Sequence, residues 1–476
     1  MTSIVWFRRD LRLSDNPALL AAVARGQPIV PLFILDDADC GSWLPGGASR
    51  WWLSGSLASL DASLRALGST LVLRRGTGER VLDELIAETG AHAVFWNRRY
   101  EPWARARDAR IKSSLQGRGI VAESFNASLL CEPWELKTAQ GGPYRVFTPF
   151  RRALFARGTP GVPCTAPERL LMPDRFPASD DLPAWRLRPS APDWASGFSG
   201  LWSPGESGAQ ARLGIFLAER LDAYAGARDR PAVMGTSMLS PHLHFGEIGP
   251  RQIVSAVRLC GDAAPGTDSY LSEIAWRDFS YHLLYHFPDL PERPLRSEFL
   301  QFPWREDEAG LAAWQHGKTG YPIVDAGLRA LWETGWMHNR VRMIAASFLV
   351  KDLMIPWQAG ACWFWDTLVD ADLASNSASW QWVSGCGADA APYFRIFNPV
   401  LQGEKFDAAG DYVRRFVPEL ARLPNALLHA PWRARPIDLA DAGVELGTTY
   451  PRAIVDHDGA RRRALDAYRQ IRHADG

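Results

Sequence analysis

The first 125 residues alternate short apolar runs with longer stretches of helical periodicity, and this alternation restricts the possible folds more than any other feature. Short runs rich in β-branched and aromatic residues are typical of buried strands. Strands separated by helices pair in parallel through right-handed crossovers. We therefore predict an α/β N-terminal domain with a parallel, Rossmann-like sheet. The expected strands are Ser3–Phe7, Ile29–Ile34, Thr70–Leu73, Ala93–Trp96 and Ile120–Phe125, and the expected helices are Pro17–Ala24, Ser49–Leu67, Glu79–Thr89 and Ala104–Gln116.

A change in composition near residue 130 divides the chain. Eight prolines between Pro160 and Pro192 exclude long helices there, so we expect a connector that runs over the surface. Helical periodicity dominates from about Gly205, which predicts an all-α second half. A chain of 476 residues is also too long for one ordinary core. The expected parts are an α/β domain at 1–130, a linker at 131–205 and a helical domain at 206–476.

The overall composition is that of a soluble globular protein, with 47% hydrophobic and 22% charged residues. The six cysteines show no C-x-x-C spacing, which predicts reduced thiols in a cytoplasmic protein and no metal site. We expect no membrane association, since no apolar run has the length of a span and charged residues from Arg8 onward interrupt any signal peptide. The net charge is zero, so a basic surface for nucleic acid must be local. No G-x-G-x-x-G follows the first expected strand.

Seven of the 21 tryptophans lie between Trp332 and Trp382, interleaved with Arg, Asn and Asp. Such a cluster suggests a flat aromatic ligand, base stacking or a route for electrons. Core packing is the alternative, and for any single indole it is the more frequent role.

A hydroxyl-rich segment runs from Gly235 to Pro241. Ser240 before Pro241 is a good N-cap and N1 pair, and such a helix start can also hold a phosphate. Capping alone is the alternative. Tyr224 and Arg228 lie upstream with helical spacing.

Two later helices are expected to carry chemistry. One runs from about Asp268 to Phe287 and places Glu273, Trp276, Arg277 and Ser280 on one side. The alternative for Glu273 and Arg277 is an ordinary i,i+4 ion pair.

The other helix is expected to start near Trp336. Its positions predict a possible ligand-pocket wall of Trp336, Asn339, Arg340, Met343 and Ser347, and an inward face of Val341, Ile344, Ala345 and Phe348.

The segment from Asp370 to Asn376 is expected to form a loop that holds two acids at i,i+2. These carboxylates can ligate a hard cation, cap the next helix or accept hydrogen bonds from a ligand. Asn376 offers an uncharged donor and acceptor.

Four stretches carry a resemblance over nearly the whole chain. They are Val5–Arg12, Gly317–Asp325, Trp336–Arg340 and Asp389–Pro399. On these motifs the chain resembles the DNA photolyases of the photolyase/cryptochrome family, most closely the bacterial cyclobutane pyrimidine dimer type. The resemblance implies an N-terminal antenna domain, a linker and a helical domain that binds FAD and damaged DNA.

The resemblance also implies roles toward FAD. Tyr224 and residues Thr236, Ser237, Met238, Leu239 and Ser240 would hold the phosphates and ribityl chain. Asn339, Asp370, Ala371 and Asp372 would line the adenine and flavin rings. Asn376 would face flavin N5, where an amide favours a fully reduced, catalytic flavin. Trp380, Trp357 and Trp304 match the chain of indoles that photoreduces the flavin in this family.

The implied substrate is DNA containing a cyclobutane pyrimidine dimer, and photolyases are among the enzymes known to flip their target out of the duplex. Residues matching the dimer pocket and its rim, with Glu273 also catalytic, are Glu273, Trp276, Arg277, Asn339, Arg340, Met343 and Trp382. Arg228 and Arg395 would contact phosphates, and Gln402 would contact the DNA. Met343 stands where the (6-4) branch carries a second pocket histidine.

The antenna chromophore stays open among methenyltetrahydrofolate, 8-hydroxy-5-deazaflavin and FMN. Trp103-Ala104 replaces the Asn-Glu pair of the well-known folate site, and Arg50, Trp51 and Trp52 look more like other antenna sites. We expect a monomer. The competing hypothesis is a cryptochrome-like blue-light photoreceptor, which the absence of a long C-terminal tail and the amide of Asn376 disfavour.

Overall fold

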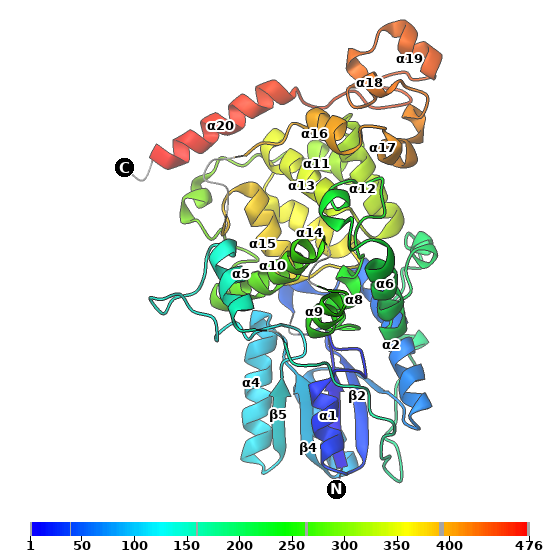
Figure 1. The fold of residues 1–476 in the computed structure, drawn as a ribbon, viewed down its shortest axis with the longest axis vertical. Helices are drawn as coiled ribbons and strands as arrows, with labels where there is room; N and C mark the ends of the chain where they lie inside the picture. The colour runs from blue at the N-terminus through cyan, green and yellow to red at the C-terminus, as the bar shows by residue number, and fades with distance from the viewer. Residues whose placement is uncertain (1, 39, 159, 262–264, 390–394, 474–476) are drawn as a thin grey trace.

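The structure is a computed structural model that describes residues 2–38, 40–158, 160–261, 265–389 and 395–473. Figure 1 places a parallel sheet with its helices at one end of the long axis and a larger helical assembly above it. Within the described residues no helix has both the length and the apolar character needed to cross a bilayer.

The N-terminal sheet has five parallel strands in the order β3-β2-β1-β4-β5, which confirms the predicted α/β fold. Trp6 of the central strand β1 is in register with Leu32 of β2 and Trp96 of β4. Every residue of β1 and β2 is buried, because helices cover both faces. The strands are β1 (Thr2–Phe7), β2 (Ile29–Leu35), β3 (Val72–Arg75), β4 (Ala91–Asn97) and β5 (Val121–Phe125), so β3 begins two residues later than predicted.

Successive residues of β1 feed two separate cores. Val5 and Phe7 pack in one core with residues of α1 and α2, while Ile4 and Trp6 pack in the other with residues of α3 and α4. This is the result expected from a side-chain period of two. The four helices are α1 (Pro17–Ala24), α2 (Gly47–Ala66), α3 (Gly78–Thr89) and α4 (Pro102–Gly117).

The connector is more structured than predicted. It contains one α-helix, α5 (Phe147–Ala156), whose Phe147 ring stacks on Trp276 at 3.8 Å. Trp185, Phe198 and Trp202 are buried in the core that α2 also lines. The description as a purely superficial linker is therefore wrong, because its aromatic residues fill space between the two halves. As the prolines predict, residues 160–192 form no α-helix.

The second half is helical, as predicted. The π-helix Phe348–Asp352 continues directly from α13. The α-helices are α6 (Glu206–Glu219), α7 (Tyr224–Ala227), α8 (Ser240–His244), α9 (Pro250–Leu259), α10 (Thr267–His286), α11 (Glu308–Gln315), α12 (Pro322–Thr334), α13 (Asn339–Ser347), α14 (Trp357–Thr367), α15 (Leu373–Ser384), α16 (Pro399–Phe406), α17 (Asp411–Phe416), α18 (Asn425–Leu428), α19 (Pro436–Ala442) and α20 (His457–His473).

Two predicted helix starts are wrong. Helix α13 begins at Asn339 rather than near Trp336, because His338 Nδ1 accepts a hydrogen bond from Arg340 N at 3.2 Å and caps the helix. Helix α8 already includes Ser240, so Leu239 stands at the N-cap and no side chain caps this end.

Buried polar contacts join the two halves. Glu206, the first residue of α6, accepts a hydrogen bond from Leu13 N at 2.8 Å. Glu247 Oε1 accepts from the indole N–H of Trp52 on α2 at 2.9 Å. Arg12 donates to Gly246 O at 2.9 Å. The carboxyl edge of the sheet therefore contacts the helical half through charged groups.

Candidate functional site

The hydroxyl-rich segment forms the loop between α7 and α8. An added Cβ at Gly235 would lie 2.6 Å from Ala227 Cβ, so this close approach requires glycine. Met238 adopts a φ of +53°, and its side chain and that of Leu239 are buried in the core. Any contact these two residues make with a ligand is therefore through the backbone. Thr236 and Ser237 are half-buried and Ser240 is exposed.

Beside this loop, Tyr224 is buried and the Arg228 guanidinium lies 5.5 Å from its ring centroid. Arg228 Nη1 reaches Glu273 Oε1 at 2.5 Å, which joins the end of α7 to α10. The alternative i,i+4 pair of Glu273 with Arg277 is therefore wrong. Arg277 turns toward the connector, donates to Ser128 O, and is not brought together with Glu273.

A second ion pair lies next to the first. Arg340 Nη2 of α13 is 2.9 Å from Asp229 Oδ2, and its guanidinium lies 4.4 Å from the Phe406 ring. Because Asp229 follows Arg228, the charges Glu273, Arg228, Asp229 and Arg340 alternate in sign across α10, α7 and α13. Around them, Asn339 is exposed and Met343 is half-buried.

The two acids of the predicted loop have different partners. Asp370 accepts two hydrogen bonds from Arg342 Nη2, at 3.1 and 2.8 Å. Asp372 Oδ1 accepts from Ser375 N at 2.9 Å, so it caps α15 as one of the three alternatives proposed. Ala371 between them is buried. No group of His, Cys, Asp and Glu that could hold a metal ion occurs in the described part of the chain.

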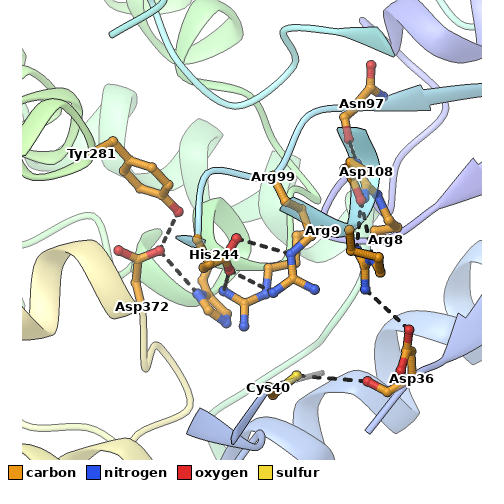
Figure 2. Close-up of polar contacts among 12 residues, drawn as sticks. Arg8, Arg9, Asp36, Cys40, Asn97, Arg99, Asp108, His244, Tyr281 and Asp372 are labelled. Carbon is orange, nitrogen blue, oxygen red and sulfur yellow. Dashed lines mark hydrogen bonds and ion pairs between the residues drawn. The ribbon is translucent and has the colours of Figure 1, made fainter. Parts of the chain in front are cut away.

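Asp372 also lies between Tyr281 and His244 in a buried polar cluster, which Figure 2 shows. Its Oδ2 accepts from Tyr281 OH at 2.5 Å and lies 3.5 Å from His244 Nδ1. Burial alone would raise the pKa of Asp372, but the nearby His244 and Arg277 and the hydrogen bond from Tyr281 outweigh it and hold the pKa below the ordinary value. Asp372 is therefore a carboxylate at neutral pH.

Several buried polar groups of this region lack a partner among the described residues. They are His338 Nε2, Arg340 Nε and Ser377 Oγ. Burial lowers the pKa of His338 to about 4, so the ring is neutral and its Nε2 carries the proton. Asn376, one residue before Ser377, donates from Nδ2 to Ala361 O at 3.0 Å, which leaves Oδ1 as an acceptor. Unpartnered buried polar groups are rare in folded proteins.

Comparisons with known proteins identify the family of this chain. Residues 3–168 match the DNA photolyase family, and residues 270–470 match the FAD binding domain of DNA photolyase. The deoxyribodipyrimidine photo-lyase of Agrobacterium fabrum is 53% identical over 98% of both chains. The chain belongs to the photolyase/cryptochrome family.

Both cryptochromes and photolyases of this family are similar to this chain. Cryptochrome-1 of Arabidopsis thaliana is 42% identical over 98% of this chain and 70% of its own length. The crystal structure of a bacterial class III photolyase from Agrobacterium tumefaciens superimposes with a TM-score of 0.96, at 53% identity, over 99% of this chain and 98% of that one. As in that family, the helical half is an FAD-binding domain.

The three indoles matched to the photolyase electron route have different surroundings. Trp380 is buried, with its ring centroid 5.1 Å from Phe364 and 6.2 Å from Trp314. Trp357 is also buried, and Trp304 is half-buried with its ring 4.5 Å from Phe302.

Trp314 was missed in the sequence because it lies outside the tryptophan cluster. It is fully buried and donates to Ala345 O at 2.9 Å. Trp365 is a core residue, whereas Trp332 is 44% exposed and stacks on Trp194 at 5.1 Å and on Trp363 at 5.9 Å.

Two other candidate lesion residues lie on α10 and α15. Trp276 is half-buried against Phe147, and Trp382 donates from its indole to Asp389 O at 3.1 Å. Residues 390–394 of the Asp389–Pro399 motif lie outside the described residues. Arg395 is exposed and Gln402 is half-buried on α16.

The antenna candidates at residues 50–52 belong mainly to the core of this photolyase relative. Trp51 and Trp52 are buried, and only Arg50 reaches the surface, where it pairs with Asp37 at 2.9 Å. Trp103, at the position of the folate-type asparagine, is half-buried.

Proposed function

We propose that this protein is a DNA photolyase that repairs cyclobutane pyrimidine dimers in DNA, using blue light and reduced FAD. The observation that carries the proposal is the alternating charge array of Glu273, Arg228, Asp229 and Arg340 beside buried polar groups that lack partners. A full-length relative of 53% identity named deoxyribodipyrimidine photo-lyase supports it.

The proposed FAD site uses the residues around this array. Tyr224, Thr236, Ser237 and Ser240 hold phosphates and the ribityl chain with hydroxyl groups, and Met238 and Leu239 with their backbone. Asn339, Asp370, Ala371 and Asp372 line the rings. When bound, FAD supplies an excited-state electron, while the protein supplies position and electrostatics.

Asn376 has the most specific role toward the flavin. Because its Nδ2 donates a hydrogen bond to Ala361 O, its Oδ1 can accept a hydrogen bond from a protonated group such as N5–H of a reduced flavin. A carboxylic acid at this position would offer a proton instead. The amide therefore favours the reduced, catalytic state.

The proposed lesion pocket accepts a dimer flipped out of the duplex. Trp276 and Trp382 offer aromatic faces for the fused pyrimidines, Met343 lines the wall, and Asn339 and Glu273 meet their polar edges. In its protonated form Glu273 would also donate a hydrogen bond to the negative charge that develops on the dimer. Arg228 and Arg395 contact DNA phosphates, with Arg277, Arg340 and Gln402 at the rim.

Other proposals follow from the same assignment. Trp380, Trp357 and Trp304 carry electrons from the surface to the flavin. A second chromophore, which is methenyltetrahydrofolate, 8-hydroxy-5-deazaflavin or FMN, acts as antenna on the α/β domain at 1–130. The linker at 131–205 joins this domain to the catalytic domain at 206–476. The protein works as a cytoplasmic monomer.

The experiment that tests repair is illumination of the reduced, FAD-loaded protein with DNA containing cyclobutane dimers. We expect dimers to disappear under blue light and to persist in the dark. Unchanged dimer content under light, with FAD bound and reduced, would refute the proposal. It would then favour a blue-light receptor, the alternative suggested by the 42% identity to cryptochrome-1.

A further inference from the structure

His244 is a buried histidine at the end of α8, and it lies beside Asp372, a carboxylate of the proposed FAD site (Figure 2). Only 4% of His244 is exposed, and its Nδ1 has no hydrogen-bond partner among the described residues. This nitrogen lies 3.5 Å from Asp372 Oδ2. Hydrogen bonds of this kind close at about 2.9 Å, so a movement of about half an ångström completes one. A buried polar nitrogen beside a single carboxylate is rare enough to require an explanation.

The surroundings of His244 fix its charge and its tautomer. Burial, and then the positive charge of Arg9 from the α/β half, lower the pKa of His244 to about 4, so the ring is neutral at pH 7. Arg9 is itself paired with Glu101 at 3.0 Å. Because a carboxylate only accepts, the proton of the neutral ring belongs on Nδ1, beside Asp372. His244 therefore supplies a donor without adding a charge.

The Asp372 carboxylate is held at both oxygens. Oδ1 accepts a hydrogen bond from Ser375 N at 2.9 Å, and Oδ2 accepts one from Tyr281 OH at 2.5 Å. An ionised carboxylate beside flavin rings disfavours their electron-rich reduced form, because charges interact strongly where water is excluded. Donors to the same carboxylate draw part of its charge away from the rings and weaken this repulsion.

We propose that His244 is a positioning residue for the flavin chemistry, in which its Nδ1–H orients the Asp372 carboxylate and withdraws part of its charge from the flavin rings. The inference rests on the proposed function, because it requires Asp372 to line the rings of FAD. Through Arg9, which keeps His244 neutral, the α/β half takes part in setting the potential of a flavin that the helical half binds.

The test is a redox titration of the FAD-loaded, full-length protein, followed by flavin absorption. His244→Leu removes the donor and keeps the site filled. We expect reduced FAD to bind about tenfold more weakly relative to oxidised FAD, since loss of a hydrogen bond to a charged group has an effect of this order. This is a shift of about 30 mV to more negative potential for a two-electron couple. Tyr281→Phe should shift the potential in the same direction, because it removes the other donor to Oδ2.

Two further substitutions separate the donor from packing. His244→Asn keeps an N–H near the position of Nδ1 and should leave the potential close to that of the unaltered protein. His244→Gln carries its amide farther out, at the level of Nε2, and should behave like His244→Leu. The matched control is His429→Leu, which removes another buried histidine, one that contacts Asp407 O at 2.9 Å. This variant should leave the potential unchanged.

The proposal is overturned if His244→Leu leaves the potential unchanged, if His429→Leu shifts it equally, or if the Asn and Gln variants of His244 behave alike. Should His244→Leu fail to fold, the comparison of Asn with Gln decides by itself. None of these measurements uses DNA. Absence of repair by the unaltered protein would therefore refute the proposed function without affecting this comparison.

Discussion

Arg228 and Glu273 form an ion pair between α7 and α10, with 2.5 Å between Arg228 Nη1 and Glu273 Oε1. Both groups were assigned to DNA, one to a phosphate and one to the dimer. In the structure they bind each other, so entry of a flipped dimer has to exchange this contact for contacts with the substrate.

The first prediction concerns this exchange. Glu273→Gln should lower the repair yield of bound dimers by about tenfold, because an amide is a weaker hydrogen-bond donor to the negative charge on the dimer than the protonated carboxyl group proposed for Glu273. The free energy of unfolding should fall by only about 1 kcal/mol or less, since the pair is partly exposed. Repair yield under saturating DNA and urea unfolding measure the two effects.

Glu298→Gln provides the control, because Glu298 forms a similarly exposed pair with Arg296 at 2.6 Å outside the lesion pocket. It should leave repair unchanged. Equal loss of repair in both variants would remove Glu273 from the catalytic set.

The second prediction separates photoreduction from repair. Trp304→Phe should slow photoreduction of oxidised flavin, because phenylalanine is much harder to oxidise than tryptophan, yet leave repair by chemically reduced protein intact. Transient absorption and a repair assay measure the two rates. Trp432→Phe is the control, since Trp432 is a similarly accessible indole that contacts Tyr321 instead. Loss of both activities in Trp304→Phe would contradict its proposed role.

The third prediction rests on the contact between α14 and α15. A Cβ added at Gly360 would lie 2.1 Å from Trp380 Cη2 and 2.7 Å from Leu349 Cδ2. Gly360→Ala should therefore destabilise the protein by about 1–3 kcal/mol and alter flavin photoreduction through Trp380. Denaturant unfolding should show the opposite for Gly214→Ala, a helical glycine with open space around it, which should gain up to about 1 kcal/mol. A Gly360→Ala protein of unchanged stability would disprove the close contact.

The fourth prediction concerns pH. Burial raises the pKa of Asp278 to about 7, although its carboxylate accepts hydrogen bonds from the backbone of Leu130 and Cys131. The unfolded chain loses this proton near pH 4 and the folded chain near pH 7. The contribution of Asp278 to stability is thus complete below about pH 4 and declines as the pH rises to 7, by at most about 1.4 kcal/mol per unit.

Asp278→Asn should remove this decline, because an amide oxygen still accepts the two backbone N–H groups but does not titrate. Urea unfolding of both proteins between pH 5 and 8 measures the difference in slope. Parallel stability curves for the two proteins would show that Asp278 ionises normally.

The fifth prediction concerns the DNA contact. Because the net charge of the chain is zero, the phosphate contacts have to come from local cations such as Arg395. Affinity for damaged DNA should fall steeply with salt, and Arg395→Gln should reduce the slope of log K against log salt by about one. Arg118→Gln on α4 should not change it. A flat salt response of the unaltered protein would place the DNA elsewhere.

Local patterns were sufficient to predict the framework. The five strands follow from apolar runs that are buried on both faces, and Val341, Ile344 and Ala345 point inward as their spacing predicts. The Asp372 cap is also a local relationship, three residues from its donor. These features depend on neighbours in the sequence, which is why periodicity reveals them.

Features that depend on distant partners could not be predicted. Glu273 has Arg277 one turn away but binds Arg228, 45 residues earlier in the chain. Trp332 stacks on Trp363 of its own cluster, but its other stacking partner, Trp194, comes from the connector. Asp325, at the end of the Gly317–Asp325 motif, accepts hydrogen bonds from Thr319 and from Tyr450, 125 residues later, so this part of the motif serves packing in this structure.

The polar contacts that join the two halves affect how the protein unfolds. Interfaces between domains are often loose and allow each domain to unfold alone. Here, separation of the halves would leave Glu247 without Trp52 and the Leu13 amide without Glu206. Each lost partner penalises a half-unfolded state, because unpaired polar groups of a buried surface are costly. We therefore expect the two halves to unfold together, so that a break in either half destabilises the other.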